Sequence, residues 1–298
     1  MELQTLRWFV SVADGRTVTE TAERFHTTQP AVTRGLRRLA EQFDAPLTER
    51  DGRRLRLTFA GEIAARAARS ALGEIDEAAR AVAEANDPAR GTIRVGFLNP
   101  LGTWLVPRLL LEFHATHPDV RFELRQDGAA RILEALLGGS LDLLLSSLPT
   151  DSRAHWTPLF AERLRLAVAA SHRLAKRHWV RVEELAADAW VVQPPGYGLR
   201  QRVEQIAAAA GFEPRIAFEG HDLGTLFALV GAGSGVGLFA ATLAPPQGVR
   251  LLELRPSQSR AVGLVTVPGR VLPRSAVGFA DMVRERAGGI DPVRWAEA

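Results

Sequence analysis

The chain has 298 residues, 46% of them hydrophobic and 24% charged, as in ordinary globular proteins, and this length predicts two or three domains. It contains no cysteine, which excludes disulfides, thiolate metal sites and cysteine nucleophiles. No apolar run approaches the roughly 18 residues of a membrane span, and no basic segment followed by an apolar block opens the sequence, as it would in a secretory signal. We therefore expect a cytoplasmic protein with no membrane partner.

The net charge of +3 and an isoelectric point near 10.3 are weak signs of nucleic-acid binding. Lys176 is the only lysine, and arginine, which supplies the other basic side chains, does not titrate in the accessible pH range. A small excess of arginine therefore keeps the isoelectric point high. Residues 1–58 carry ten arginines against eight acidic residues, so an argument for DNA binding has to rest on where the arginines lie.

The first 58 residues have the pattern of a winged helix-turn-helix. Helical spacing predicts a helix whose apolar face is Leu3, Leu6, Phe9, Val10 and Ala13. Thr17 and Glu20 form a capping box that opens a second helix. Thr28 is expected to cap a third helix, with Pro30 in its first turn. That helix has the buried face Val32, Leu36, Leu39 and Phe43. The dipeptide Asp51-Gly52 then predicts a hairpin turn.

Residues 59–90 read as a linker helix and hinge. From Thr58 to about Ala85 the alanine-rich pattern predicts one long helix, which ends at a polar stretch, 86–91. Along this helix runs a stripe of apolar and small side chains: Ile63, Ala67, Ala71, Ile75, Ala78 and Val82. A lone helix would expose that stripe to water, so we expect it to pair with a partner.

Residues 91–298 alternate strands and helices, which predicts an α/β fold with doubly wound parallel sheets. The expected strands include 92–97, 120–126, 141–145, 164–169, 190–192, 216–218, 236–239, 249–254 and 261–267. This region is longer than one small sheet requires. We therefore expect two lobes, lobe I over about 91–161 and 267–298, and lobe II over about 162–266.

Several motifs in this order resemble the LysR-type transcriptional regulator family. They are Leu6-Arg7-Trp8-Phe9, Ala22-Glu23-Arg24-Phe25, Thr28-Gln29-Pro30-Ala31-Val32-Thr33, Leu36-Arg37-Arg38-Leu39, Ile93-Arg94-Val95-Gly96, Gly211-Phe212-Glu213-Pro214 and Ala232-Gly233-x-Gly235-Val236. Together they span nearly the whole chain. The family usually has an aromatic residue where this chain has Thr48, and Gly35 in the middle of the third helix is expected to cost about 1 kcal/mol relative to alanine.

The resemblance implies a DNA-reading surface on the third helix and the hairpin. We expect Gln29, Thr33 and Arg34 to meet base edges in the major groove. Phosphate contacts, which fix the register, are expected from Thr28, Arg37 and Arg38. Pro30, in the first turn of the helix, belongs to the same expected DNA-binding surface. The wing adds Arg53, Arg54 and Arg56. For any one of these arginines, a solvated surface position is an equally good interpretation.

By the same resemblance, lobes I and II are expected to be similar to periplasmic binding proteins. Ligands in such folds lie beyond the carboxyl ends of strands, where helix N-termini favour anions. The residues expected to line this cleft are Asn99, Thr103, Ser146, Gln193, Tyr197 and His221. Each of them also fits an ordinary loop or cap position, and Asp222 is expected to be an N-cap. The expected effector is a small anionic molecule with an apolar body, and no metal or cofactor is expected.

These features predict a homo-oligomeric transcription factor, a dimer or tetramer that binds promoter DNA, contacts RNA polymerase and responds to a small metabolite. A regulator that needs no ligand remains an alternative. A solute-binding protein would leave the helix-turn-helix unexplained. An enzyme is not expected, because the glycine-rich segment Gly231–Gly237 matches neither the G-x-G-x-x-G nor the G-x-S-x-G pattern.

Overall fold

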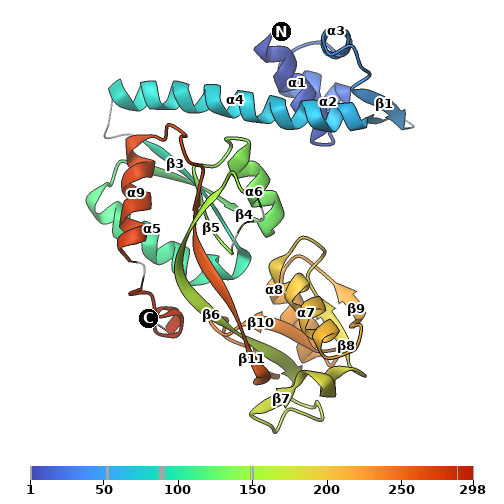
Figure 1. Ribbon diagram of the computed structural model, residues 1–298, viewed down its shortest axis with the longest axis vertical. Coiled ribbons are helices and arrows are strands. Elements are labelled where there is room, and N and C mark those ends of the chain that lie inside the picture. Colours follow the sequence, from blue (N-terminus) through green and yellow to red (C-terminus); the bar gives the residue numbers. More distant parts are fainter. Residues whose placement is uncertain are drawn as a thin grey trace. The chain divides into compact units, whose positions relative to one another are not determined.

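Figure 1 shows the computed structural model of the chain, which describes residues 2–51, 54–86, 91–147, 149, 151–286 and 288–297. The chain forms two compact units. The first comprises Met1–Ala83 with Leu137–Ser140, and the second comprises Glu84–Leu136 with Leu141–Ala298. Within the described ranges, no helix is both long and apolar enough to cross a membrane.

The first unit is a winged helix-turn-helix with a long helix after it. Its elements are α1 (Leu3–Ala13), α2 (Val18–Arg24), α3 (Gln29–Gln42), β1 (Thr48–Asp51), β2 (Arg54–Leu57) and α4 (Phe59–Asn86). The capping box of α2 is confirmed. The Thr17 hydroxyl accepts the Glu20 N–H at 3.2 Å, and the Glu20 carboxylate accepts the Thr17 N–H at 2.7 Å.

The core of this unit is smaller than the helical pattern predicts. Phe9, Val32 and Leu39 are fully buried, as expected. Phe43 was expected on the buried face of α3, but 45% of its surface is exposed. It lies at the C-cap, beyond the last turn of α3 that packs on the core. Leu3, in the first turn of α1, is exposed in the same way.

Helix α4 has one face buried within its own unit and another that is bare. Its small residues Ala64, Ala65 and Ala68 and the side chain of Leu72 pack into the helix-turn-helix core. Two ion pairs, Arg7–Asp76 at 2.5 Å and Arg69–Asp14 at 2.8 Å, join α4 to α1 and the residue that follows it. The apolar stripe noted in the sequence is exposed: Ile63, Ala67, Ala71, Ile75, Ala78 and Val82.

The second unit is built on a mixed sheet, with strand order β10-β6-β11-β5-β3-β4 and β7 beside β11. Strands β3 (Thr92–Phe97), β4 (Arg121–Gln126) and β5 (Leu143–Ser146) are parallel, whereas β6 (His155–Ala169) and β11 (Val249–Thr266) pair antiparallel. The α/β class is confirmed, but the sheet is not wholly parallel. The long strands β6 and β11 pair directly with each other, without the crossover helix that a parallel pair requires.

These two long strands differ most from the sequence expectation. β6 starts nine residues before the predicted 164–169, and β11 is continuous where two strands were expected. The polar run Arg255–Arg260, with Pro256 in it, reads as a loop. The structure instead accommodates it as a register shift between Glu253 and Gln258. Figure 1 shows both strands extending from α5 and α9 towards α7 and α8.

Each end of the long strands belongs to a separate core. In lobe I, β3, β4 and β5 pack with the helices α5 (Leu105–Thr116), α6 (Ala129–Leu137), α9 (Arg274–Glu285) and α10 (Pro292–Glu297). Lobe II contains β7 (Trp179–Arg181), β8 (Ala189–Val192), α7 (Gly198–Ala209), β9 (Arg215–Glu219), α8 (Leu223–Gly231) and β10 (Gly237–Ala240). The core changes between Leu159 and Leu164 on β6, and between Leu254 and Val262 on β11. The latter point lies before the boundary expected near residue 267.

Candidate functional site

The solvent face of α3 carries the residues expected to read DNA. Val32, Leu36 and Leu39 point into the core and turn the opposite face outward. That outward face exposes six of the expected side chains: Gln29, Pro30, Thr33, Arg34, Arg37 and Arg38. A continuous exposed face of this kind is what the major groove of B-DNA admits.

Local contacts distinguish the residues on this face. The Thr33 hydroxyl donates to the Gln29 carbonyl at 3.0 Å, and Arg37 is paired with Glu41 at 2.9 Å. Arg34 and Arg38 form no ion pair with any described residue. Thr28 occupies the N-cap position, but its side chain makes no capping hydrogen bond. The expectation that it caps α3 is therefore only half met.

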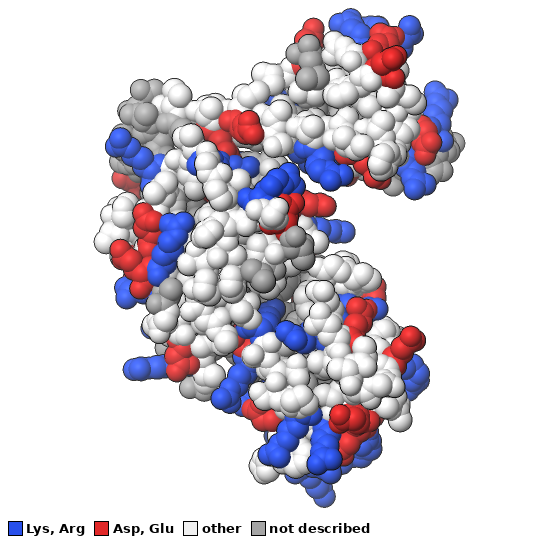
Figure 2. All heavy atoms as spheres, viewed as in Figure 1, with Lys and Arg blue, Asp and Glu red and all other residues white. Residues whose placement is uncertain are grey.

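The wing is described in part. Arg53 lies outside the described residues, and for Arg54 the backbone alone is described, paired with Asp51 in the ribbon. Arg56 is exposed and lies opposite Glu49 in the same ribbon. On the face shown in Figure 2, basic and acidic side chains are interspersed over both units, so charge alone does not locate a DNA site.

An interlobe cavity of about 350 Å³ lies in the second unit, with walls from both lobes. Ser146, at the end of β5, and Tyr197, just before α7, line it as predicted. Its lobe I wall is largely apolar, formed by Ala129, Ala130, Leu133, Leu144 and Val265. The lobe II wall is polar, formed by Tyr197, Arg200, Gln201 and Glu204. Both α6 and α7 begin at this cavity, so the N–H groups of two first turns lie beside it.

Arg200 is the basic residue of this wall and was not among the predicted cleft residues. Its Nε lies 2.6 Å from Glu204 and its Nη1 lies 2.8 Å from Glu219. Burial lowers the pKa of Arg200, but the bonds to Glu204 and Glu219 outweigh it and raise the pKa. Arg200 therefore stays charged, and two carboxylates already balance that charge. The sequence did contain a signal for Arg200, because it lies in the first turn of α7, which begins directly after the predicted cleft residue Tyr197.

A rim cluster, defined as Asn99, Asp127, Tyr197 and His221, joins the two lobes. The Tyr197 hydroxyl lies 3.3 Å from an Asp127 carboxylate oxygen and 3.0 Å from Nδ1 of His221. The Asn99 amide donates to the His221 carbonyl at 3.3 Å. The structure thus brings together three predicted residues, and Asp127 joins them from the loop after β4. Burial and the charge of Asp127 raise the pKa of Tyr197.

Two of the predicted cleft residues lie elsewhere. The Thr103 hydroxyl donates to the Pro100 carbonyl at 3.0 Å, within its own turn. Gln193 is only 5% exposed and borders a void of about 10 Å³ inside lobe II, beside Leu199 and Val203. Neither side chain borders the interlobe cavity. Asn99 and His221 do not line it either, although they contact each other between the lobes. Asp222 accepts the Thr225 N–H at 2.7 Å, as expected of the N-cap of α8.

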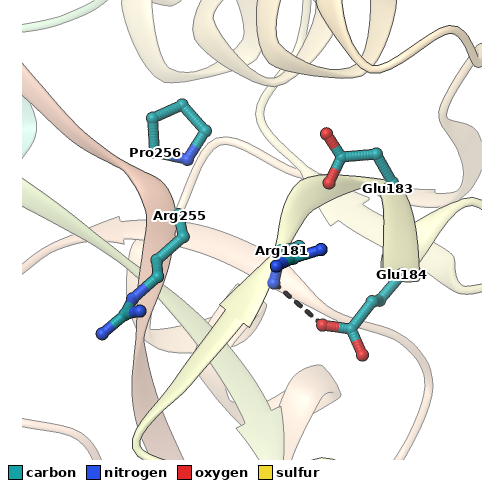
Figure 3. A pocket seen from close by; sticks show the side chains of 5 residues that line it. All are labelled: Arg181, Glu183, Glu184, Arg255 and Pro256. Carbon is teal, nitrogen blue, oxygen red and sulfur yellow. Dashed lines mark hydrogen bonds between the residues drawn. The ribbon is translucent and has the colours of Figure 1, made fainter.

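A second hollow, of about 570 Å³, lies in lobe II (Figure 3). It is lined by Arg181, Glu183, Glu184, Arg255 and Pro256, and the Arg181 N–H donates to Glu184 at 3.0 Å. The guanidinium of Arg255 lies 3.9 Å from the ring centre of Trp179. Two cations here balance two carboxylates, and Pro256 is the one apolar residue among the five that line the hollow. The interlobe cavity, with an apolar wall facing a polar one, is the better candidate for a small molecule.

Two family models match the chain. Residues 3–62 match the model of the bacterial regulatory helix-turn-helix protein, lysR family. Residues 86–288 match the LysR substrate binding domain. The first match covers the winged helix-turn-helix, and the second covers both lobes and the cavity between them.

Two of the similar proteins match nearly the whole chain, and a third matches two thirds of it. The transcriptional dual regulator GltC of Bacillus subtilis (strain 168) is 35% identical over 290 residues, covering 95% of this chain and 96% of GltC. The crystal structure of CbnR, a LysR family transcriptional regulator, has a TM-score of 0.68 at 23% identity, covering 96% of this chain and 99% of CbnR. The effector binding domain of QuiR in complex with shikimate has a TM-score of 0.63 at 22% identity, covering 67% of this chain and 98% of that domain.

Proposed function

This chain belongs to the LysR family of bacterial transcriptional regulators, and we propose that a small molecule in the interlobe cavity controls how it acts on a promoter. Like the family, it binds DNA and is a regulator rather than an enzyme. The observation that carries the proposal is the cavity of about 350 Å³ in the same chain as an exposed recognition helix. Its expected place of action is the cytoplasm, with the promoter.

DNA recognition is assigned to α3 and the wing. Glutamine suits adenine and arginine suits guanine in the major groove, which favours Gln29 and Arg34 as base-reading residues, with Thr33 between them. Thr28, Arg37 and Arg38 suit phosphates, which fix the register without reading sequence.

The bare stripe on α4 supports pairing of two copies into a dimer or tetramer, which would place two heads on two half-sites. Contact with RNA polymerase is part of the same proposal.

The proposed ligand is a compact molecule with an apolar ring or branched body and a polar, anionic end. The volume fits a small metabolite, and the wall of Leu133, Leu144 and Val265 suits an apolar body. Ser146, Ser147 and the N–H groups at the starts of α6 and α7 suit a carboxylate. Arg200 contributes less than its charge suggests, because a ligand anion would compete with Glu204 and Glu219. The chain contains no cysteine, so its response does not depend on a thiol.

A matched pair of cavity variants tests ligand control. Leu133→Trp fills the apolar wall, and Leu111→Trp places the same indole on an exposed position of α5. We expect Leu133→Trp to remove the response of a promoter reporter to cell metabolites while DNA binding in a mobility-shift assay persists. The Leu111→Trp variant keeps both. A normal response in Leu133→Trp would favour the regulator that needs no ligand.

A further inference from the structure

Tyr197, the chain's only tyrosine, both lines the interlobe cavity and joins the lobes across its rim. The ring is half-buried, and the hydroxyl reaches Asp127 of lobe I while lying against His221 of its own lobe. Tyr197 therefore both forms part of the wall of the proposed ligand pocket and connects the two lobes.

The tie has a fixed acceptor on the lobe I side. The Asp127 carboxylate oxygen that accepts from Tyr197 also accepts the Gly128 N–H at 2.7 Å, and the other oxygen lies 3.9 Å from Arg131. These contacts hold the carboxylate in place at the start of α6. At 3.3 Å the Tyr197–Asp127 bond is longer than an ordinary O–H···O hydrogen bond, so it is a tie that a competing acceptor can break.

The ring makes a second, steric contact between the lobes. A Cβ built on Gly128 would lie 3.2 Å from two ring carbons of Tyr197 and 3.3 Å from the Gly196 carbonyl oxygen. Such distances are shorter than ordinary van der Waals contact, so the ring lies directly on the glycine. A Cβ at position 128 would require the Tyr197 ring or the Gly196 carbonyl to shift by a few tenths of an ångström, and a larger side chain would require more.

From this geometry we propose that Tyr197 is a latch that holds the lobes closed when the cavity is empty. A ligand enters by breaking the Tyr197–Asp127 bond. A carboxylate of the ligand then replaces Asp127 as the acceptor of the hydrogen bond from the Tyr197 hydroxyl. The latch thus sets the threshold for opening, while the Asn99–His221 bond, also 3.3 Å long, forms a second tie. Its role in regulation rests on the proposed function, but the contact of Tyr197 with Asp127 between the lobes does not.

The first test uses the absorbance of the single tyrosine in the full chain. In the wild type we expect the phenol to ionise at higher pH than free tyrosine. Asp127→Asn removes the neighbouring charge and lowers the midpoint, whereas Asp119→Asn, at an exposed lobe I position, leaves it unchanged. A wild-type midpoint equal to that of free tyrosine, and unmoved by Asp127→Asn, would show that the latch is open in solution.

The second test follows amide hydrogen exchange at the rim, in segments 126–132 and 196–201. Loss of one such bond corresponds to roughly three- to tenfold faster exchange, which we expect for Tyr197→Phe. Gly128→Val is expected to match or exceed this, because it removes the ring contact by steric pressure. Gly278→Val is the control, since a Cβ there meets only ordinary contacts with Phe113. Wild-type exchange in both rim variants would overturn the latch.

Neither test contains a ligand or a promoter. A result that overturns the latch is therefore distinguishable from one that overturns the proposed function. If the latch is present but Leu133→Trp regulates normally, the ligand role is wrong and the latch stands. If the latch is absent and Leu133→Trp loses its response, the cavity works without it.

Discussion

Gly35, a single residue in α3, lowers the stability of its helix but makes room for a neighbouring side chain. A glycine inside α3 weakens the helix, yet a Cβ at this position would lie 2.9 Å from two carbons of the Trp8 ring. Trp8 is itself buried in the core of the first unit. The indole of α1 therefore occupies the space that a side chain at position 35 would need, and the two helices approach closely because that side chain is missing.

We expect Gly35→Ala to destabilise the first unit by about 1–3 kcal/mol, because overpacking outweighs the gain in helix propensity. Urea unfolding followed by circular dichroism measures the change. Combined with Trp8→Leu, the alanine is expected to cost much less than it does alone. Additive effects of the two substitutions would contradict direct contact between these positions.

Arg34 and Arg38 provide a matched pair on one exposed face. If Arg34 reads a base, Arg34→Ala costs about 1–3 kcal/mol on the specific site and relaxes the preference at one position. If Arg38 holds a phosphate, Arg38→Ala weakens all sequences alike and reduces the salt slope by about one. Mobility shifts on the native and a scrambled site at two salt concentrations separate the roles. Identical profiles for the two variants would reject the assignment.

At the scale of the element, α4 has a face that its own unit does not cover. Val82 is 64% exposed and Ile63 is 52% exposed, and both lie on the stripe that the sequence predicts. An amphipathic helix of 28 residues leaves such a stripe in water unless a second surface covers it. A second copy of the same helix offers the same stripe in return, as a symmetric interface requires.

Ile75→Glu tests this pairing by placing a carboxylate on the stripe. Burying an unpaired charge is unfavourable, so self-association is expected to weaken by about tenfold or more. Light scattering over a concentration series measures it. Arg66→Glu places a carboxylate on another, exposed face of α4 and is expected to leave assembly intact. Equal effects from the two variants would show that charge itself, and not the stripe, governs association.

At the scale of the whole molecule, β6 and β11 carry a buried ion pair between the two cores of the second unit. Glu162 on β6 is fully buried. It accepts from Arg260 Nε on β11 at 2.7 Å and from the Thr242 hydroxyl at 2.7 Å. The pair lies where both strands pass from one lobe core to the other, so it fixes the register there.

Arg260→Ala leaves the Glu162 carboxylate buried without its cation, and we expect a loss of about 3–5 kcal/mol. The double variant Glu162→Leu with Arg260→Met removes both charges and is expected to cost far less. Chemical denaturation of the full chain compares them. If the double variant were as unstable as Arg260→Ala, the shapes of these two side chains, and not the balance of their charges, would be what stabilises the strands.

The sequence alone determined the local structure of this protein and the order of its parts. Helical spacing, the Thr17–Glu20 box and the Asp222 cap act within a few residues, so the pattern reveals them directly. The exposed face of α3 and the bare stripe of α4 follow from the same spacing, because one buried face leaves the other in solvent. The α/β class and the family motifs also came from the sequence.

Only the tertiary structure decided which distant loops meet. Asp127, Tyr197 and His221 come from three loops, and no spacing along the chain indicates that they touch, whereas Thr103 and Gln193 had equally suitable positions and lie elsewhere. The long strands were hidden for the same reason. Whether residues 255–260 form a loop or a strand depends on neighbouring strands that a sequence pattern does not contain. Arg255 pairs with β7, and residues 258–260 pair with β6.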